Sequence, residues 1–181
     1  VRRIFRQAVR RVLNVEDGGL AADTQVNGGA LTIHQGGTSQ NTILASGAEN
    51  VYGTSNGTQI NGGVQNVYGV ANSSVIASGG EQRVYGDVQS TQVNQSGILT
   101  VLSGGNAQNA QLTSGTLNLY SGGTLSGKIS AVESVINVYG DNDIANLELD
   151  KSLVTMVKGV DYGTLNIENL NGTGIFNIST D

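Results

Sequence analysis

The sequence predicts an all-β protein that folds as a right-handed parallel β-helix, or β-solenoid, and three observations support this prediction. Short apolar segments recur at intervals of 16 to 19 residues, glycine-rich turns separate them, and proline is absent. A constant period of this length is typical of a repeat architecture in which each repeat forms one coil. Proline would remove a backbone donor from the hydrogen-bond ladder between coils, so its absence is consistent with a β-solenoid.

Two interleaved series of apolar positions define the repeat. The first series is Ile33, Val51, Val67, Val84, Val101, Leu119 and Val138, and the second is Val26, Ile43, Ile60, Ile76, Val93, Leu112, Ile129 and Leu147. Two series with one period indicate at least two strands per coil, each paired in register with its equivalent in the next coil. The tripeptide Val-Tyr-Gly, which begins at Val51, Val67, Val84 and Val138, would mark one corner of successive coils. A leucine-rich repeat has a similar period, but its Leu-x-x-Leu-x-Leu signature is missing.

The first residues differ from the repeats and predict a short amphipathic helix. Apolar residues from Val1 to Leu13 follow the 3.6-residue period, and five arginines occupy the other faces. We expect this segment, residues 1–15, to cap the open end of the solenoid, and residues 16–181 to form the repeat domain. A helix that binds a membrane or nucleic acid is the alternative for this segment.

Composition and charge limit the classes of function. The chain has no cysteine, which excludes disulfides and thiolate metal sites. Beyond the arginine-rich start, four basic residues stand against fourteen acidic ones, a net charge of −10. Such a charge repels nucleic acid and anionic membrane, so neither is an expected partner.

The motifs that suggest nucleotide or metal chemistry are incomplete. The segment Gly122–Ile129 matches the phosphate-loop pattern through Lys128, but Ile129 stands where a magnesium-binding hydroxyl is needed. Asp141, Asn142 and Asp143 suggest calcium, yet the tandem glycine-aspartate repeats of calcium-binding solenoids are absent. We expect a solvated turn there, and no cofactor or metal.

Catalytic residues are not apparent either. Glu49 and Glu81 lie near equivalent coil positions, but no acidic pair recurs beside a basic partner, and His34 stands alone. We therefore expect a protein that is not an enzyme. A polysaccharide-degrading β-helix and an inert structural spacer are the alternatives.

Tyrosines follow the first apolar series and should stack from coil to coil. The set is Tyr52, Tyr68, Tyr85, Tyr120 and Tyr139. An aromatic ladder stabilises a solenoid, and because tyrosine is enriched at interfaces the same residues form a possible interaction strip.

The repeats also carry a family resemblance. The segments "SGGEQRVYGDVQSTQVN" and "SGGNAQNAQLTSGTLNLYSGGTLSGKI" resemble the repeats of self-associating bacterial autotransporter adhesins, the group of the diffuse-adherence adhesin, TibA and antigen 43. The resemblance covers about Val26 to Ile129, and Gly163–Asp181 looks like a late passenger segment. It implies a passenger domain at the bacterial cell surface, or secreted, that mediates adhesion, autoaggregation, biofilm formation and virulence.

The resemblance also implies partners and a modification. These are an autotransporter heptosyltransferase, an identical passenger on a neighbouring cell and a host-cell receptor, with membrane contact only through a C-terminal translocator barrel beyond this chain. O-linked heptose on serine or threonine is the expected modification. Candidate acceptors are the turn serines Ser46, Ser55, Ser78, Ser103, Ser114 and Ser121.

Overall fold

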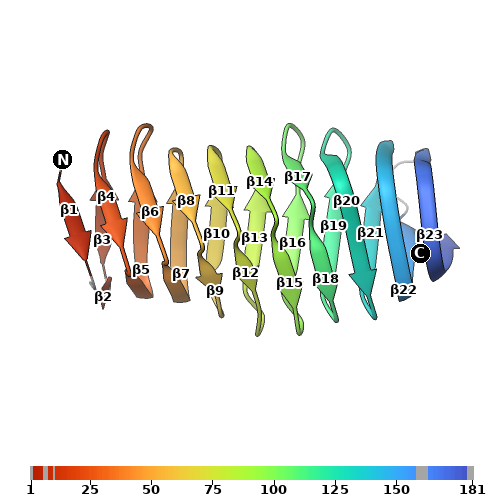
Figure 1. The fold of residues 1–181 in the computed structure, drawn as a ribbon, viewed down its shortest axis with the longest axis horizontal. Coiled ribbons are helices and arrows are strands. Elements are labelled where there is room, and N and C mark those ends of the chain that lie inside the picture. The colour runs from red at the N-terminus through yellow and green to blue at the C-terminus, as the bar shows by residue number, and fades with distance from the viewer. Residues whose placement is uncertain (1, 6–7, 10, 158–162, 179–181) are drawn as a thin grey trace.

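The computed structural model describes residues 2–5, 8–9, 11–157 and 163–178, and this part of the chain is a parallel β-solenoid. The coils stack along one axis, with β1 at one end of the rod and β23 at the other (Figure 1). Every strand pairing is parallel between one coil and the next, as the sequence predicts. The described residues contain no helix and therefore no helical membrane span.

Most coils contain three short strands, which form three faces of the rod. The first face holds β1 (Arg3–Phe5), β4 (Leu20–Ala22), β6 (Thr38–Gln40), β8 (Thr54–Asn56), β11 (Val70–Asn72), β14 (Asp87–Gln89) and β17 (Asn106–Gln108). The second face holds β2 (Ala8–Val9), β9 (Gln59–Ile60), β12 (Val75–Ile76), β15 (Gln92–Asn94) and β18 (Gln111–Thr113). The third face holds β3 (Val12–Val15), β10 (Val64–Val67), β13 (Glu81–Val84), β16 (Ile98–Val101), β19 (Thr116–Tyr120) and β21 (Val135–Tyr139).

Five longer strands continue around a corner of the coil. They are β5 (Gln25–Ile33), β7 (Ile43–Val51), β20 (Thr124–Val132), β22 (Asn142–Val157) and β23 (Leu165–Ile178). β22 pairs with both β20 and β21, and β23 then pairs with β22 along most of its length. Residues 163–178 of the late segment identified in the sequence thus form the last described coil, and residues 179–181 lie outside the described residues.

The first apolar series is confirmed as one continuous buried column. Each member pairs in register with the next, from Ile33 to Val138, and the column extends back to Val15 and forward to Met156. The members from Ile33 to Val138 are completely buried. Burying one such aliphatic side chain stabilises a fold by roughly 1.5–3 kcal/mol, so this column is a principal source of stability.

The second series is correct except at two positions. Leu44, not Ile43, pairs with Val26 and is buried, whereas Ile43 is exposed. Leu112 pairs with Ala131, not with Ile129, although Ile129 is buried as expected. At the first position strand alternation turns Leu44 inward and its neighbour Ile43 outward. At the second, Ile129 and Ala131 both face the core, and the register continues the Leu112 column through Ala131 and Leu149 while Ile129 pairs with Leu147.

The prediction of an N-terminal capping helix over residues 1–15 is wrong. Of residues 1–15, those that the structure describes contain three strands, β1 to β3, which pair with β4 and β5 of the following coil. This segment is therefore a coil of the solenoid, and no separate capping element occurs in the described part. Backbone pairing with the next coil satisfies donors and acceptors that a strand end would otherwise leave open, and this outweighs the helical spacing of the apolar residues.

The glycines of the repeated Val-Tyr-Gly lie in a column at the corner between the third and first faces. A Cβ atom on Gly86 would contact the carbonyl oxygens of Gly69 and Tyr68 and lie 2.7 Å from the Tyr68 carbonyl carbon. Gly69 packs in the same way on the coil before it. Gly140 differs, because the corner after Tyr139 is longer and this glycine packs beside Ser121 instead.

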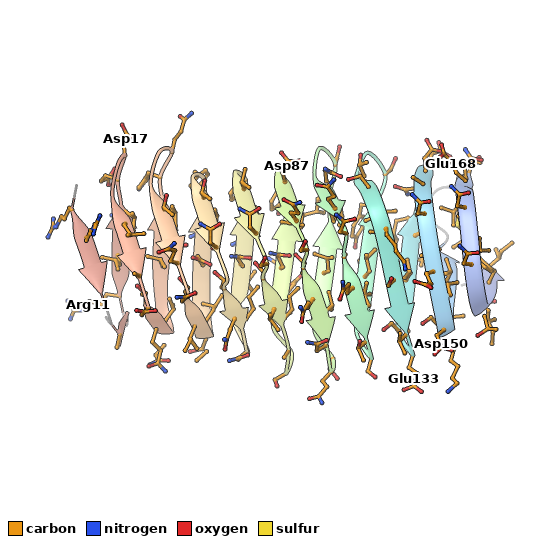
Figure 2. All side chains as sticks on the ribbon, viewed as in Figure 1. Arg11, Asp17, Asp87, Glu133, Asp150 and Glu168 are labelled. Carbon is orange, nitrogen blue, oxygen red and sulfur yellow. The ribbon has the colours of Figure 1, made fainter. Side chains whose placement is uncertain are left out.

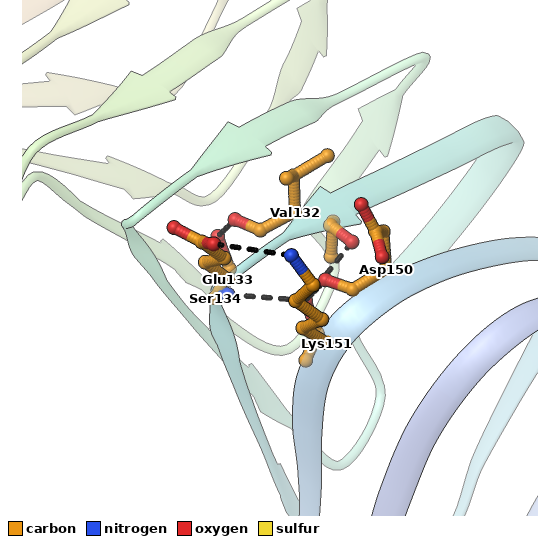
Figure 3. A network of polar contacts seen from close by, with 7 residues as sticks. Val132, Glu133, Ser134, Asp150 and Lys151 are labelled. Atoms are coloured by element: carbon orange, nitrogen blue, oxygen red, sulfur yellow. Dashed lines mark hydrogen bonds and ion pairs between the residues drawn. The ribbon is translucent and has the colours of Figure 1, made fainter.

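Left-handed backbone conformations recur at the other two corners. The corner between the first and second faces uses Asp23, Asn41, Gly57, Ser73, Ser90, Asn109 and Gly127, all with φ between 51° and 71°. At the corner between the second and third faces, Glu133 and Lys151 are left-handed, and their side chains lie 3.8 Å apart (Figure 3). Ser134 and Ser152 follow them, and the Ser134 N–H donates to the Ser152 hydroxyl at 3.0 Å. The serines therefore satisfy backbone groups where the turns are tight.

We predict that Gly86→Ala destabilises the rod by about 2–3 kcal/mol, because the new methyl group overlaps backbone atoms that cannot move without separating two coils. Gly79→Ala is the control. Gly79 has φ +83° and nothing within 4 Å of an added Cβ, so only the left-handed backbone penalty of about 1 kcal/mol applies. Urea unfolding followed by circular dichroism gives both values. Equal losses would contradict the packing argument.

Candidate functional site

The outward surface of the third face consists of three rows that run along the rod. The apolar row holds Ala30, Ala48, Val64, Glu81, Ile98, Thr116, Val135 and Leu153. The asparagine row holds Thr32, Asn50, Asn66, Arg83, Thr100, Asn118, Asn137 and Thr155. The aromatic row, at the corner beside them, holds His34, Tyr52, Tyr68, Tyr85, Leu102, Tyr120 and Tyr139. Strand alternation places all three rows on one side of the rod.

Side-chain amides of the asparagine row bond from coil to coil. The Asn66 amide donates to the Asn50 side-chain oxygen at 2.9 Å, and Asn137 donates to Asn118 at 2.9 Å. On the first face, Asn72 donates to Asn56 at 3.0 Å. Each of these amides keeps further donor or acceptor capacity, because an asparagine side chain has two N–H groups and two acceptor positions. The row can therefore bond to a second surface.

The tyrosines stack as the sequence predicts. Ring centroids lie 4.8 Å apart for Tyr52 and Tyr68, 4.8 Å for Tyr68 and Tyr85, and 4.4 Å for Tyr120 and Tyr139. Leu102 interrupts the row between Tyr85 and Tyr120. Burial, and repulsion from the ionised forms of Tyr85 and Tyr52, raise the pKa of Tyr68, so Tyr68 remains uncharged at neutral pH. His34 continues the row, with its ring 6.4 Å from that of Tyr52.

Charge is sparse on the third face and concentrated at the edges. Glu81 and Arg83 form an ion pair at 2.8 Å in the middle of the face, and Thr100 donates to Glu81 at 3.1 Å. Apart from His34, the other members of the three rows are uncharged. Asp17, Asp87 and Glu168 lie along one edge of the rod in Figure 2, and Glu133 and Asp150 along the opposite edge. The third face is thus nearly neutral on a strongly acidic protein.

The predicted acceptor serines fall into two groups. Five are exposed at corners of the coils: Ser46, Ser78, Ser103, Ser114 and Ser121. Ser55 is completely buried, with its hydroxyl 3.4 Å from the Glu49 carboxylate, so it is not available on the folded surface. Ser73 and Ser90 are exposed, left-handed corner residues that sequence reasoning missed, although their 17-residue spacing could have revealed them.

Glu49 forms an interior polar cluster that the sequence did not predict. Its carboxylate is completely buried and accepts hydrogen bonds at 2.8 to 3.4 Å from Ser39, Thr42, Ser55, Thr58 and Gln65. Gln82 in turn donates to the Gln65 side-chain oxygen at 2.6 Å. Burial raises the pKa of the Glu49 carboxyl, while hydrogen bonds from the surrounding hydroxyls and amide offset part of the increase.

The register separates Glu49 from Glu81. Glu49 stacks on Gln65 inside the rod, whereas Glu81 stacks on Val64 on the outer surface. The two carboxyl groups therefore lie in different columns. Lys128, from the phosphate-loop match, bonds to Glu148 and lowers the pKa of that carboxyl, and Ile129 is buried.

Two acidic residues share a shallow hollow of about 550 Å³ near the end of the rod. The Asp141 carboxylate accepts from the Thr164 backbone N–H at 2.6 Å, and Asp143 accepts from the Asn166 amide at 2.8 Å. Both carboxylates thus hold β23 against β22. Within the described residues, no three acidic or histidine side chains gather as metal ligands.

Comparison with known proteins bears on the architecture. The comparison supports the parallel β-solenoid as the fold of this chain. The chain is similar to the crystal structure of a hyper-glycosylated TibA fragment whose glycosylation TibC catalysed, with a TM-score of 0.67 and 23% sequence identity over 99% of this chain and 75% of that one. At this identity the likeness shows a shared fold. No protein-family model matches the chain, and no curated protein matches it significantly.

We predict that Glu49→Gln changes the pH dependence of stability. Because the folded pKa of Glu49 is raised, the folded protein binds this proton more tightly than the unfolded chain, and the carboxyl's contribution to stability falls as pH rises through the folded pKa. The variant lacks that titration, so its stability relative to the parent should increase as pH rises from the ordinary glutamate pKa through the raised pKa of folded Glu49. Urea unfolding across this range measures the difference. A difference that does not vary with pH would contradict the prediction.

Proposed function

We propose that this protein is a passenger domain displayed at, or secreted from, the bacterial cell surface, where it mediates adhesion and self-association and accepts O-linked heptose. The observation that carries the proposal is the third face, which extends along the rod and is flat, nearly neutral and lined with asparagine and tyrosine. The sequence resemblance to autotransporter adhesins and the fold shared with TibA support it.

The third face suits a second copy of the same rod. Most of the acidic residues lie elsewhere, so two copies can approach through this face with little charge repulsion. Glu81 and Arg83 offer one charge of each sign, so a partner rod can match them with its own pair. This is electrostatic complementarity of the kind that steers association.

Many weak contacts can add up along such a face. A net hydrogen bond stabilises an association by only about 1 kcal/mol, so a short contact would not hold two rods together. Aligned rods repeat the contact at each coil, and multiple copies on one cell raise the effective concentration further. Autoaggregation, biofilm formation and binding to a host-cell receptor follow from the same surface property.

The corner serines support the acceptor role. Five predicted serines project from turns where a transferase can approach them, and Ser73 and Ser90 add two more. TibA, which shares the fold, is glycosylated by TibC. We therefore expect an autotransporter heptosyltransferase as the enzyme partner, with Ser55 unmodified in the folded chain.

No observation favours an enzymatic function over this one. Glu49 is buried, Glu81 pairs with Arg83, and Asp141 and Asp143 bond to the next coil. These carboxyl groups have structural partners in the part of the chain that the structure describes. A spacer without binding activity is the remaining alternative, and self-association separates it from an adhesin.

We predict that the purified chain self-associates. The double variant Val64→Glu with Val135→Glu should raise the Kd of this self-association at least about tenfold. The two glutamates place like charges and remove apolar contact on the third face, and neither original side chain makes a hydrogen bond. Gln59→Glu with Gln111→Glu is the control, since it adds equal charge to the exposed surface of the second face. Sedimentation velocity over a concentration series measures association. A monomeric parent, or equal loss in both variants, would refute the role of this face.

We predict that co-expression with an autotransporter heptosyltransferase adds mass in steps of one heptose. Peptide mapping should place the sugars on exposed corner serines such as Ser78 and Ser114, because their hydroxyls are accessible. A transferase inactivated in its active site is the control. An unchanged mass, with the enzyme active on another acceptor, would remove the acceptor role and leave self-association to be judged separately.

A further inference from the structure

The aromatic row has a chemical property that does not depend on adhesion. Within it, Tyr52, Tyr68 and Tyr85 form one uninterrupted stack, which we call tract 1, and Tyr120 and Tyr139 form a second, tract 2. Leu102 separates the two tracts. Phenol rings held in contact in this way are candidates for coupling to one another.

The geometry within each tract is regular. Interplanar angles are 6°, 9° and 5°, so neighbouring rings are almost parallel. Because in-register strands project equivalent side chains in the same direction, the hydroxyl groups and the ring carbons beside them lie on the same side of the stack. The tyrosines also remain open to solvent: the exposed fraction is 48% for Tyr52, 44% for Tyr68 and 37% for Tyr120. A reagent from solution can therefore reach them.

We infer that the two tracts are sites of oxidative cross-linking, at which a one-electron oxidant of the peroxidase and hydrogen peroxide class joins neighbouring tyrosines into dityrosine. Each phenol loses one electron to the oxidant and its hydroxyl proton to water, leaving a tyrosyl radical. Two radicals form a carbon–carbon bond between the ring carbons ortho to oxygen. The hydrogens on those carbons then move to the oxygens, which restores both aromatic rings. The pair loses two hydrogen atoms overall, and one hydrogen peroxide becomes two water molecules.

Proximity selects the pairs that couple. Holding two reactive groups side by side raises their effective concentration by orders of magnitude over encounter between molecules. Within a tract, neighbouring rings are 4.4 to 4.8 Å apart. Tyr85 and Tyr120 are two coils apart, roughly 10 Å at the spacing of neighbouring strands, and Leu102 lies between them. Coupling should therefore join Tyr52 to Tyr68, Tyr68 to Tyr85 and Tyr120 to Tyr139.

The product would be a covalent connection between successive coils. Each bond would join two residues separated by 16 to 19 positions in the sequence and adjacent across the ladder. A cross-link of this kind restricts the unfolded chain, so oxidation should make the rod more resistant to unfolding. Oxidants can thus stabilise the rod after the protein has folded, by linking its coils covalently.

The test is to treat the full chain with a peroxidase and hydrogen peroxide at low protein concentration, where encounters between molecules are rare. Dityrosine fluorescence and intact mass report coupling, with a loss of two hydrogen atoms per cross-link. Peptide mapping should find the three within-tract pairs on monomeric protein. The same treatment in concentrated urea should give a mixture of pairs, which shows that the oxidant is active.

Two variants make the assignment specific. Tyr68→Phe keeps an aromatic ring in the stack but should abolish both tract 1 cross-links while the Tyr120–Tyr139 product remains as an internal control. Leu102→Tyr should connect the tracts and create new cross-linked peptides that contain position 102. Cross-links mainly between tracts or between chains would overturn the proposal. So would an uncoupled folded chain under conditions in which the urea-unfolded chain couples.

Discussion

The in-register parallel pairing of each coil with the next is the constraint on which the rest of this structure depends. Backbone N–H and C=O groups that leave one coil must find partners in the neighbouring coils, because an unpaired buried group costs as much as a lost hydrogen bond. Pairing in register then places equivalent side chains directly above one another. Ile33, Val51 and Val67 thus form a dry column, and Tyr52, Tyr68 and Tyr85 form a stack of rings.

The same constraint explains why polar residues can occupy the core. A lone carboxyl group in an apolar interior is costly, but Glu49 lies where the columns bring four hydroxyl-bearing residues and Gln65 around it. Gln65 stacks on Glu49 and donates to it, and Gln82 stacks on Gln65 and donates in turn. A ladder of amides therefore extends the carboxylate's hydrogen bonding through two further coils. Leu99 stacks on Gln82 and ends this polar column.

The repeat and its period could be predicted from the sequence because the inward Val, Ile and Leu residues are similar in every coil. Register could not be predicted to the residue, since coil lengths vary with the number of turn residues after each Val or Leu. Because of that variation the sequence does not reveal that Glu49 and Ser55 are buried, and it predicts Ile43 in the core at the position that Leu44 occupies in the structure. At the N-terminus, the helical period competed with the coil period: Val15 lies 18 residues before Ile33 and pairs with it. Long-range pairing overrode the local pattern there.

Function on such a scaffold is distributed for the same physical reason that the fold is stable. A column repeats one environment many times, so it favours extended surfaces such as the asparagine and aromatic rows over a single convergent pocket. The two places where the rows change are then the most informative. Glu81 and Arg83 place one charge of each sign at the centre of the face, and Leu102 interrupts the stack of rings one coil further on. An otherwise uniform rod thereby acquires a fixed reference position along its length, which would define the register of the proposed self-association.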